Sequence, residues 1–343
     1  MFIFSNDLGI DLGTSYVRIY QAKKGVVLRE PSVVALNKNT GVVVQTGTEA
    51  RNMMGRTPGN LITTRPLRRG VIADYELTAR LLKDMVHKVI KRAIVKPRVI
   101  INMPCGITEV EERAVLQAVS EAGARRVCML EAPLLAGIGA QLNVSHADGH
   151  MVVDIGGGTT DIGVLTLSGV ALAAAVPVAG MTFDEAIVKY LLRHHGVIVS
   201  ESIAEDIKLS IGCVEPRPDV QQMVVKGRDA QTGLAKQVVV TSEELLEALR
   251  RPARQIADEV VDVLRRITPE LVSDVQKNGI VLTGGGSQLW GMDVLLQERT
   301  GMKCMLADDA ESCVIYGCGK SLSRINRLDE GSVNSARRQL LKD

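Results

Sequence analysis

The sequence contains few aromatic residues, which make up only 3% of its 343 residues. This scarcity argues against a surface on which the bases of single-stranded nucleic acid would stack. The formal net charge is +2, so no strong basic field indicates a nucleic-acid partner either. No apolar run approaches the roughly 18 residues of a transmembrane helix, and we expect none in this chain.

Signals of secretion and of a disulfide framework are also missing. The first residues do not form a signal peptide, and the six cysteines contain no C-x-x-C pair. We therefore expect a cytosolic, reduced protein, and we expect the several cysteines that lie in apolar runs to be small buried side chains. With 46% hydrophobic and 23% charged residues over this length, the chain can bury the cores of two domains and is not disordered.

The most informative stretch begins with the apolar, β-branched segment 151–155, which is typical of a buried strand. It then turns through Gly156, Gly157 and Gly158. Glycine has no Cβ, so a phosphate can approach such a turn closely and meet several backbone N–H groups. Asp154 stands at the end of the strand, where its carboxylate can hold Mg²⁺ through water. One such turn is weak evidence, because most glycine-rich turns after a strand are only turns.

The chain contains this pattern more than once. Residues 8–16 run from a strand through Asp11 and Gly13, and residues 280–287 form a third strand that ends in three glycines and a serine. Three such turns in this order resemble the actin–hexokinase–chaperone ATPase superfamily. In that superfamily, two like-folded halves hold ATP between two phosphate-binding hairpins, and the third turn supports the adenosine. The two copies that contain an aspartate fit such an internal duplication.

Four further segments narrow the resemblance. They are residues 30–35 (EPSVVA), 47–50 (GTEA), 54–60 (MGRTPGN) and 66–75 (PLRRGVIADY). Together with the glycine turns, they are similar to the MreB family, the bacterial actin homologues that shape rod cells. The similarity covers nearly the whole chain, and the departures described below indicate a divergent paralogue.

The resemblance implies an α/β protein with an actin-like two-domain fold. Duplicated ribonuclease H-like mixed sheets, flanked by helices, would enclose a nucleotide cleft between the halves. The first domain would comprise residues 1–145 and 310–330, with a small subdomain at about 32–70. The second would comprise residues 146–309, with a small subdomain at about 179–241.

The resemblance also assigns residues to ATP and Mg²⁺. Asp11 and Asp154 would hold Mg²⁺ through waters. The residues that would bind ATP lie in the three turns and in one Glu-x-x-Lys element: Gly13, Thr14, Ser15, Tyr16, Gly156, Gly157, Gly158, Thr159, Glu205, Lys208, Gly284, Gly285, Gly286 and Ser287. For Glu205 and Lys208 a second interpretation stays open, in which they form a solvated ion pair at the start of a helix capped by Ser202.

At the hydrolysis site the sequence departs from the family. MreB proteins carry a glutamate directly before Pro133, where it helps to orient the water that attacks the γ-phosphate, but this chain has Ala132. A methyl group can neither accept a proton nor orient a water. Thr159, Asp161 and Glu131 remain as catalytic candidates, although Glu131 stands one residue early and Asp161 replaces the usual glutamate. We therefore expect ATP binding with slow or absent hydrolysis.

Three segments are candidates for membrane contact. Ala93, Ile94 and Val95 stand among four cations, so the apolar side chains can enter a bilayer interface while the cations meet anionic head groups. The resemblance favours this interpretation over a connector whose apolar residues point inward. For residues 1–4 a first strand is favoured over a membrane-touching tip. For the basic tail 331–343 a solvated segment is favoured over membrane or partner contact.

Local patterns predict where several helices begin and end. The pattern Ser/Thr-x-x-Glu predicts helix starts at Thr108 with Glu111, Thr182 with Glu185, Ser202 with Glu205, and Thr241 with Glu244. Pro252 is expected to kink or split the long helix that follows Thr241, because proline lacks the N–H group that the helix interior needs.

These observations favour an ATP-binding cytoskeletal protein over an enzyme. By resemblance it would polymerise, in paired protofilaments, on the inner face of the cytoplasmic membrane, control rod cell shape, and position cell-wall synthesis with membrane proteins of the elongation complex. ATP would act as a switch that closes the cleft, which requires binding and not turnover. A non-polymerising regulatory paralogue and a small-molecule kinase of the same superfamily remain alternatives. An Hsp70-type chaperone is disfavoured, because the chain leaves no room for a substrate-binding domain.

Overall fold

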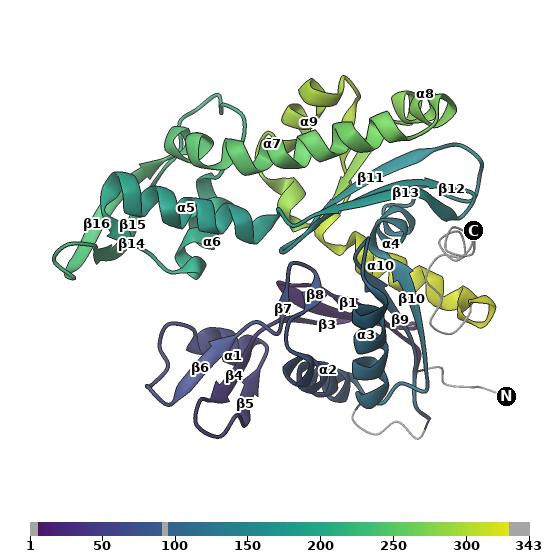
Figure 1. Ribbon diagram of the computed structural model, residues 1–343, viewed down its shortest axis with the longest axis horizontal. Coiled ribbons are helices and arrows are strands. Elements are labelled where there is room, and N and C mark those ends of the chain that lie inside the picture. Colours follow the sequence, from purple (N-terminus) through teal and green to yellow (C-terminus); the bar gives the residue numbers. More distant parts are fainter. Residues whose placement is uncertain (1–5, 91–94, 329–343) are drawn as a thin grey trace.

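The computed structural model describes residues 6–90 and 95–328. Within these residues the strands form two five-stranded mixed sheets, two three-stranded sheets and one two-stranded sheet. Figure 1 shows these sheets in two halves, one built mostly from the first part of the chain and the other mostly from the residues after 150.

The two five-stranded sheets have the same topology. The first has the order β3-β2-β1-β9-β10 and the second the order β13-β12-β11-β17-β18. In each sheet, three successive antiparallel strands are followed by two strands that pair in parallel. The strands are β1 (Leu8–Leu12), β2 (Tyr16–Gln21), β3 (Gly25–Pro31), β9 (Arg98–Met103), β10 (Arg126–Glu131), β11 (His150–Ile155), β12 (Thr160–Thr166), β13 (Gly169–Val176), β17 (Ile280–Thr283) and β18 (Cys304–Leu306). This repeated order is an internal duplication.

A small sheet is attached to each half (Figure 1). The first contains β4 (Val34–Asn37), β5 (Val43–Thr46) and β6 (Leu61–Thr64), with helix α1 (Thr48–Met53); the second contains β14 (Val197–Ile198), β15 (Gln222–Asp229) and β16 (Ala235–Thr241). A separate hairpin consists of β7 (Leu67–Arg68) and β8 (Val71–Ile72). The small sheets lie within segments 32–70 and 179–241, for which the sequence predicts subdomains, and the domain boundaries themselves stay a prediction.

Helices cover both main sheets and join them. They are α2 (Tyr75–Val89), α3 (Glu109–Glu121), α4 (Ala132–Gly139), α5 (Gly180–His195), α6 (Glu201–Ile211), α7 (Ser242–Arg266), α8 (Pro269–Asn278), α9 (Met292–Thr300) and α10 (Cys313–Ser321), with 3₁₀ turns η1 (Gly285–Gln288), η2 (Ala310–Ser312) and η3 (Leu322–Arg327). Helix α4 contacts strands of both main sheets, and α10 returns to the first sheet and packs on α4. A Cβ on Gly139 would lie 1.8 Å from the carbonyl oxygen of Cys313. Glycine therefore lets these two helix backbones touch where the halves meet.

The cores follow the apolar patterns of the strands. All five residues of β1 are buried, and so are all four residues of β17. The six cysteines are free thiols and buried, as their apolar surroundings in the sequence predict. These buried strands end at the glycine turns, so the two cores fix the positions of the turns.

Two of the four predicted capping boxes are present. The side chains and backbones of Thr108 and Glu111 bond reciprocally at the start of α3, and those of Thr241 and Glu244 do so at the start of α7. Of the two effects expected at Pro252, a kink or a split, the split is wrong. Helix α7 runs continuously past this residue, whose ring is buried, because packing over 25 residues outweighs one lost hydrogen bond.

The other two predicted helix starts are wrong. Helix α5 begins at Gly180 and not at Thr182, because the N–H groups of Gly180 and Met181 donate to carbonyl oxygens of the second glycine turn at 3.0 and 2.8 Å. Helix α6 begins two residues earlier than predicted, because Ser200 and not Ser202 accepts the capping hydrogen bond. The hydrogen bonds of Gly180 and Met181 tie the first turn of α5 to the site described next.

Candidate functional site

The first two glycine turns have the same local geometry. In the turn between β1 and β2, the N–H of Gly13 donates to the carbonyl oxygen of Tyr16 at 3.1 Å. In the turn between β11 and β12, the N–H of Gly156 donates to the carbonyl oxygen of Thr159 at 2.9 Å. The two halves of the molecule thus present matching backbone loops.

The two turns meet face to face. A Cβ on Gly158 would lie 2.5 Å from the Oγ1 of Thr14, and a Cβ on Gly157 would lie 2.0 Å from the Oγ of Ser15. Only glycine allows this approach. Thr14 also accepts a hydrogen bond from the N–H of Gly70 at 3.0 Å, so the β7–β8 hairpin closes over the same point.

The turns line a cleft with a volume of about 300 Å³. The predicted site residues that line it are Asp11, Gly13, Thr14, Ser15, Tyr16, Asp154, Gly156, Gly157, Gly158, Thr159, Asp161, Glu205, Lys208, Gly284, Gly285 and Gly286. Ser287 is a predicted ATP-binding residue that the structure places elsewhere. It is buried, and its hydroxyl donates to the carbonyl oxygen of Gly284 at 2.6 Å.

Six polar residues of the cleft were missed from the sequence: Arg18, Arg29, Asn102, Asp184, Gln288 and Glu311. Side chains alternate between the two faces of a strand, so the position of Arg18 in β2, opposite Asp11, is a signal that could have placed it on the same face of the sheet as Asp11. The others come from distant parts of the chain, and no local pattern marks them.

Four buried carboxylates line the cleft, those of Asp11, Asp154, Asp161 and Asp184. Asp11 accepts a hydrogen bond from the Nδ2 of Asn102 at 3.0 Å, and Asp154 accepts one from the hydroxyl of Thr283 at 2.7 Å. Asp161 accepts hydrogen bonds from a backbone N–H at 2.7 Å and from the hydroxyl of Thr159 at 3.0 Å. Burial raises the pKa of Asp154 to about 7 and the pKa of Asp161 to about 6. The charges of Asp161 and Asp11 add to the shift of Asp154, and the charge of Glu131 adds to the shift of Asp161.

This arrangement fits a divalent cation that is shared with a phosphate ligand. Mg²⁺ at nucleotide sites is held by one or two carboxylates, by waters and by phosphate oxygens. Asp11 and Asp154 supply two carboxylates at corresponding strand ends. Among residues 6–90 and 95–328, no group of three or more His, Cys, Asp or Glu side chains forms a metal site made of protein ligands alone.

The third glycine turn packs against the second. Gly284 has a φ of +81°, which favours glycine, and a Cβ there would lie 2.3 Å from the carbonyl oxygen of Ile155. The N–H of Gly284 donates to the carbonyl oxygen of Ala310 at 2.7 Å. The turn therefore forms the side of the cleft next to the second glycine turn.

Glu205 and Lys208 line the cleft, but the predicted ion pair between them is wrong. Glu205 instead pairs with Arg51 of α1 at 2.5 Å. Lys208 pairs with Asp184 at 2.7 Å and donates to the carbonyl oxygen of Gly180 at 2.9 Å. The Arg51–Glu205 pair joins the small-sheet region of one half to that of the other.

The MreB/Mbl protein family matches residues 5–330 of the chain. The chain belongs to this family. It is 43% identical to the cell shape-determining protein Mbl of Bacillus cereus over 332 residues, which are 96% of this chain and 100% of Mbl. It is also 43% identical to the cell shape-determining protein MreB of Escherichia coli (strain K12), over 94% of this chain and 95% of MreB.

Solved structures confirm the predicted actin-like fold. MreB5 of Spiroplasma citri bound to ADP matches with a TM-score of 0.90 and 32% identity, covering 94% of this chain and 98% of MreB5. The same protein bound to AMPPNP matches with a TM-score of 0.88 and 31% identity, covering 95% and 98%. The double helical filament of MamK matches with a TM-score of 0.79 at 24% identity over 92% and 98%, which shows the fold alone.

Within this MreB/Mbl fold, the catalytic candidates are not equivalent. Thr159 and Asp161 line the cleft, and so does Ala132 as the first residue of α4. Glu131 precedes it and is 7% exposed, and it is not among the cleft-lining residues. A carboxylate at position 132 would face the cleft, whereas the one at position 131 does not.

The candidate membrane segment is described only in part. Ala93 and Ile94, like the terminal segments 1–4 and 331–343, lie outside the described residues. Val95 is described and is 55% exposed, so its side chain has the access that membrane contact requires. Within residues 6–90 and 95–328, no helix is long and apolar enough to cross a bilayer.

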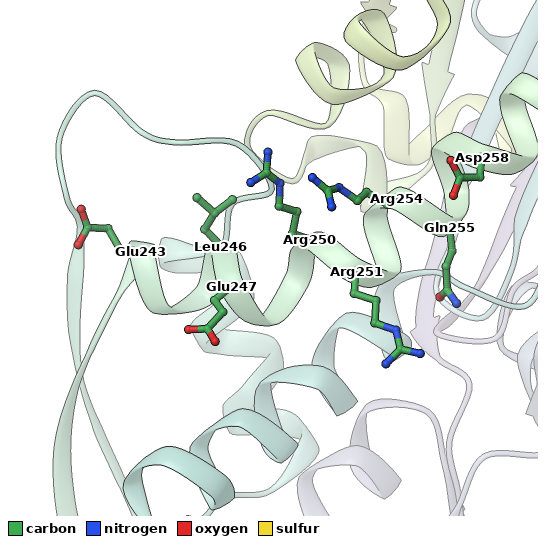
Figure 2. A pocket seen from close by; sticks show the side chains of 8 residues that line it. All are labelled: Glu243, Leu246, Glu247, Arg250, Arg251, Arg254, Gln255 and Asp258. Carbon is green, nitrogen blue, oxygen red and sulfur yellow. The ribbon is translucent and has the colours of Figure 1, made fainter.

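A second depression lies along the outer face of α7 (Figure 2). Its lining consists of α7 side chains alone, namely Glu243, Leu246, Glu247, Arg250, Arg251, Arg254, Gln255 and Asp258. The charged side chains among them are exposed. This surface offers no glycine turn and no convergent backbone N–H groups, so the cleft is the better candidate for binding a phosphorylated ligand.

Proposed function

We propose that this MreB/Mbl family protein binds ATP with Mg²⁺ in the cleft and assembles into filaments on the inner face of the cytoplasmic membrane. There it would help to determine rod cell shape and to position cell-wall synthesis with membrane proteins of the elongation complex. The proposal is supported by the cell shape-determining relatives Mbl and MreB, and by the ADP- and AMPPNP-bound structures of MreB5.

The observation that carries the nucleotide site is the meeting of the two glycine turns above the buried aspartates. Residues 13–16 and 156–159 would direct backbone N–H groups at the phosphates from opposite sides. Asp11 and Asp154 would hold Mg²⁺, which when bound neutralises phosphate charge. Gly284, with Glu205 and Lys208, would form the adenosine side.

Ligand binding in the cleft would change how the two halves are arranged relative to each other. Each turn belongs to a different half, so a ligand that contacts both turns binds the closed arrangement more tightly than an open one. This difference in affinity stabilises the closed arrangement. The Arg51–Glu205 ion pair bridges the halves in the same arrangement. We propose that the closed form is the one that polymerises, and that Ala132 makes turnover slow and the filaments long-lived.

Sedimentation of the purified protein with anionic liposomes tests this proposal. The samples contain Mg-ATP, Mg-ADP or no nucleotide, and the pellets are imaged by electron microscopy. We expect membrane-bound filaments that require ATP. A Gly158→Ala variant serves as control, because its Cβ would collide with Thr14. Tight ATP binding without filaments or lipid binding would support a regulatory paralogue instead.

A further inference from the structure

The two halves of the cleft carry different charges at matching positions. Asp11 of β1 pairs across the sheet with Arg18 of β2. At the corresponding position of the second half, Asp154 of β11 pairs with Asp161 of β12. Directly opposed residues of antiparallel strands project from the same face of the sheet, and all four line the cleft. The duplication therefore places an arginine in the first half where the second half has a carboxylate.

Arg18 is fixed in this position. It is 9% exposed, its Nη1 donates to the Oδ2 of Asp11 at 3.1 Å, and its Nη2 donates to the Oε1 of Glu311 in η2. A guanidinium that is already held by two carboxylates loses little conformational freedom when it binds a further anion. The two contacts leave other N–H groups of the guanidinium for a ligand.

A second arginine extends the positive side of the cleft. Arg29 of β3 lies directly opposite Arg18 of β2 and also lines the cleft. Two like charges in opposed positions repel each other, and Glu311 offsets this repulsion because it contacts both guanidinium groups. The arginines are thereby held beside the first glycine turn.

The positive charge of Arg18 weakens the attraction of Asp11 for a divalent cation. The carboxylate of Asp11 is already partly neutralised by Arg18, so it attracts a divalent cation more weakly than a free carboxylate would. Asp154 contacts the neutral hydroxyl of Thr283 instead and keeps its attraction for a cation. The anionic phosphates of a nucleotide would meet a permanent positive charge on the Arg18 side and the metal on the Asp154 side.

We propose that Arg18 is a phosphate-binding residue of the cleft, and that it supplies part of the charge neutralisation that Mg²⁺ would otherwise provide. The chain then binds nucleoside polyphosphates with a weak dependence on Mg²⁺. The inference rests on the proposed nucleotide site, which it deepens.

Calorimetric titration with ATP, in excess Mg²⁺ and in EDTA, tests this inference in the wild type and in Arg18→Leu. We expect the wild type to lose about tenfold or less in affinity when Mg²⁺ is removed. Arg18→Leu should lose at least a further factor of about ten in EDTA, which is the size expected for a charge-assisted hydrogen bond, and much less in Mg²⁺. Arg18→Lys, which keeps the charge, should retain most of the binding in EDTA.

Two controls separate this effect from misfolding and from net charge. Arg18→Leu combined with Glu311→Leu removes the guanidinium together with its half-buried partner Glu311 and should fold, as circular dichroism would show, while keeping the strong Mg²⁺ dependence. Arg266→Leu removes an exposed charge on α7, whose ion pair with Asp262 is 3.5 Å long, and should behave as the wild type.

The outcomes distinguish this inference from the proposed function. If the wild type binds ATP in Mg²⁺ but Arg18→Leu weakens binding by the same factor in Mg²⁺ and in EDTA, Arg18 is structural and the inference fails alone. A wild type that binds ATP only in Mg²⁺ overturns it as well. If the wild type does not bind ATP in either condition, the proposed nucleotide site fails too.

Discussion

Asp154→Asn is expected to stabilise the ligand-free protein at alkaline pH while weakening its binding of Mg-ATP. Asp154 is 8% exposed, and burial raises its pKa from the ordinary value of 3.8 to about 7, with the charges of Asp161 and Asp11 adding to the effect. The native state therefore binds more protons than the unfolded state between these two pH values. Consequently the free energy of unfolding falls as the pH rises through this window.

The size of the effect follows from the same pKa. At about 1.4 kcal/mol per pH unit, the change from 3.8 to about 7 corresponds to roughly 4 kcal/mol of lost stability above pH 8. Water entry into the open cleft reduces this value, so we expect Asp154→Asn to gain about 2 to 3 kcal/mol at pH 8 and about 1 kcal/mol at pH 5. The asparagine oxygen can still accept the hydrogen bond from Thr283.

Urea unfolding without nucleotide, followed by circular dichroism at pH 5 and pH 8, measures this difference. Asp148→Asn, in an exposed loop, removes the same formal charge and serves as the control. A variant that is no more stable than the wild type at pH 8, or that gains equally at both pH values, would refute the reasoning. Such a result would mean that the ionised carboxylate of Asp154 does not destabilise the folded protein when no nucleotide is bound.

Three further predictions concern hydrolysis, binding and membrane contact. Ala132→Glu should raise the rate of phosphate release by about a hundredfold, the lower range for general acid–base groups, and an unchanged rate in a phosphate-release assay would contradict the role of this position. Gly158→Ala would place a Cβ 2.9 Å from the Cβ of Thr14, and the affinity for ATP should fall by about tenfold or more in equilibrium dialysis. Val95→Asp should weaken binding to anionic vesicles by about tenfold, through loss of apolar insertion. The matched control Val294→Asp makes the same change at another exposed valine and should leave vesicle binding unchanged, and equal losses in both variants would argue against the loop at residue 95.

The glycine turns could be predicted from the sequence because their function resides in contiguous residues. A buried strand, an aspartate at its end and glycines after it determine where a turn lies and what it can approach. The repetition of this signal at Asp11 and Asp154 also indicated the duplication that the two sheets share. The family resemblance supplied the order of the parts.

The remaining parts of the cleft could not be predicted, because they depend on residues that are distant in the sequence. Arg18 meets Glu311 across 293 residues, and Arg51 meets Glu205 across 154 residues. The pattern around Glu205 read locally as a helix cap with an ion pair to Lys208. The position of α1 in the other half determines the actual partner of Glu205, and local spacing carries no information about it.

Helix starts show the same limit. Thr182 has the local pattern of a cap, but the backbone of the second glycine turn accepts hydrogen bonds from Gly180 and Met181 and starts α5 earlier. A satisfied tertiary hydrogen bond outweighs a local capping preference of about 1 kcal/mol.

The central claim is that the phosphates of ATP bind between the two glycine turns. The most direct measurement is a crystal structure of the protein grown with Mg²⁺ and AMPPNP. The account predicts phosphate density between residues 13–16 and 156–159, with the adenosine beside Gly284. Nucleotide density at another surface, such as the α7 depression, or a nucleotide-free cleft at saturating ligand, would contradict the account.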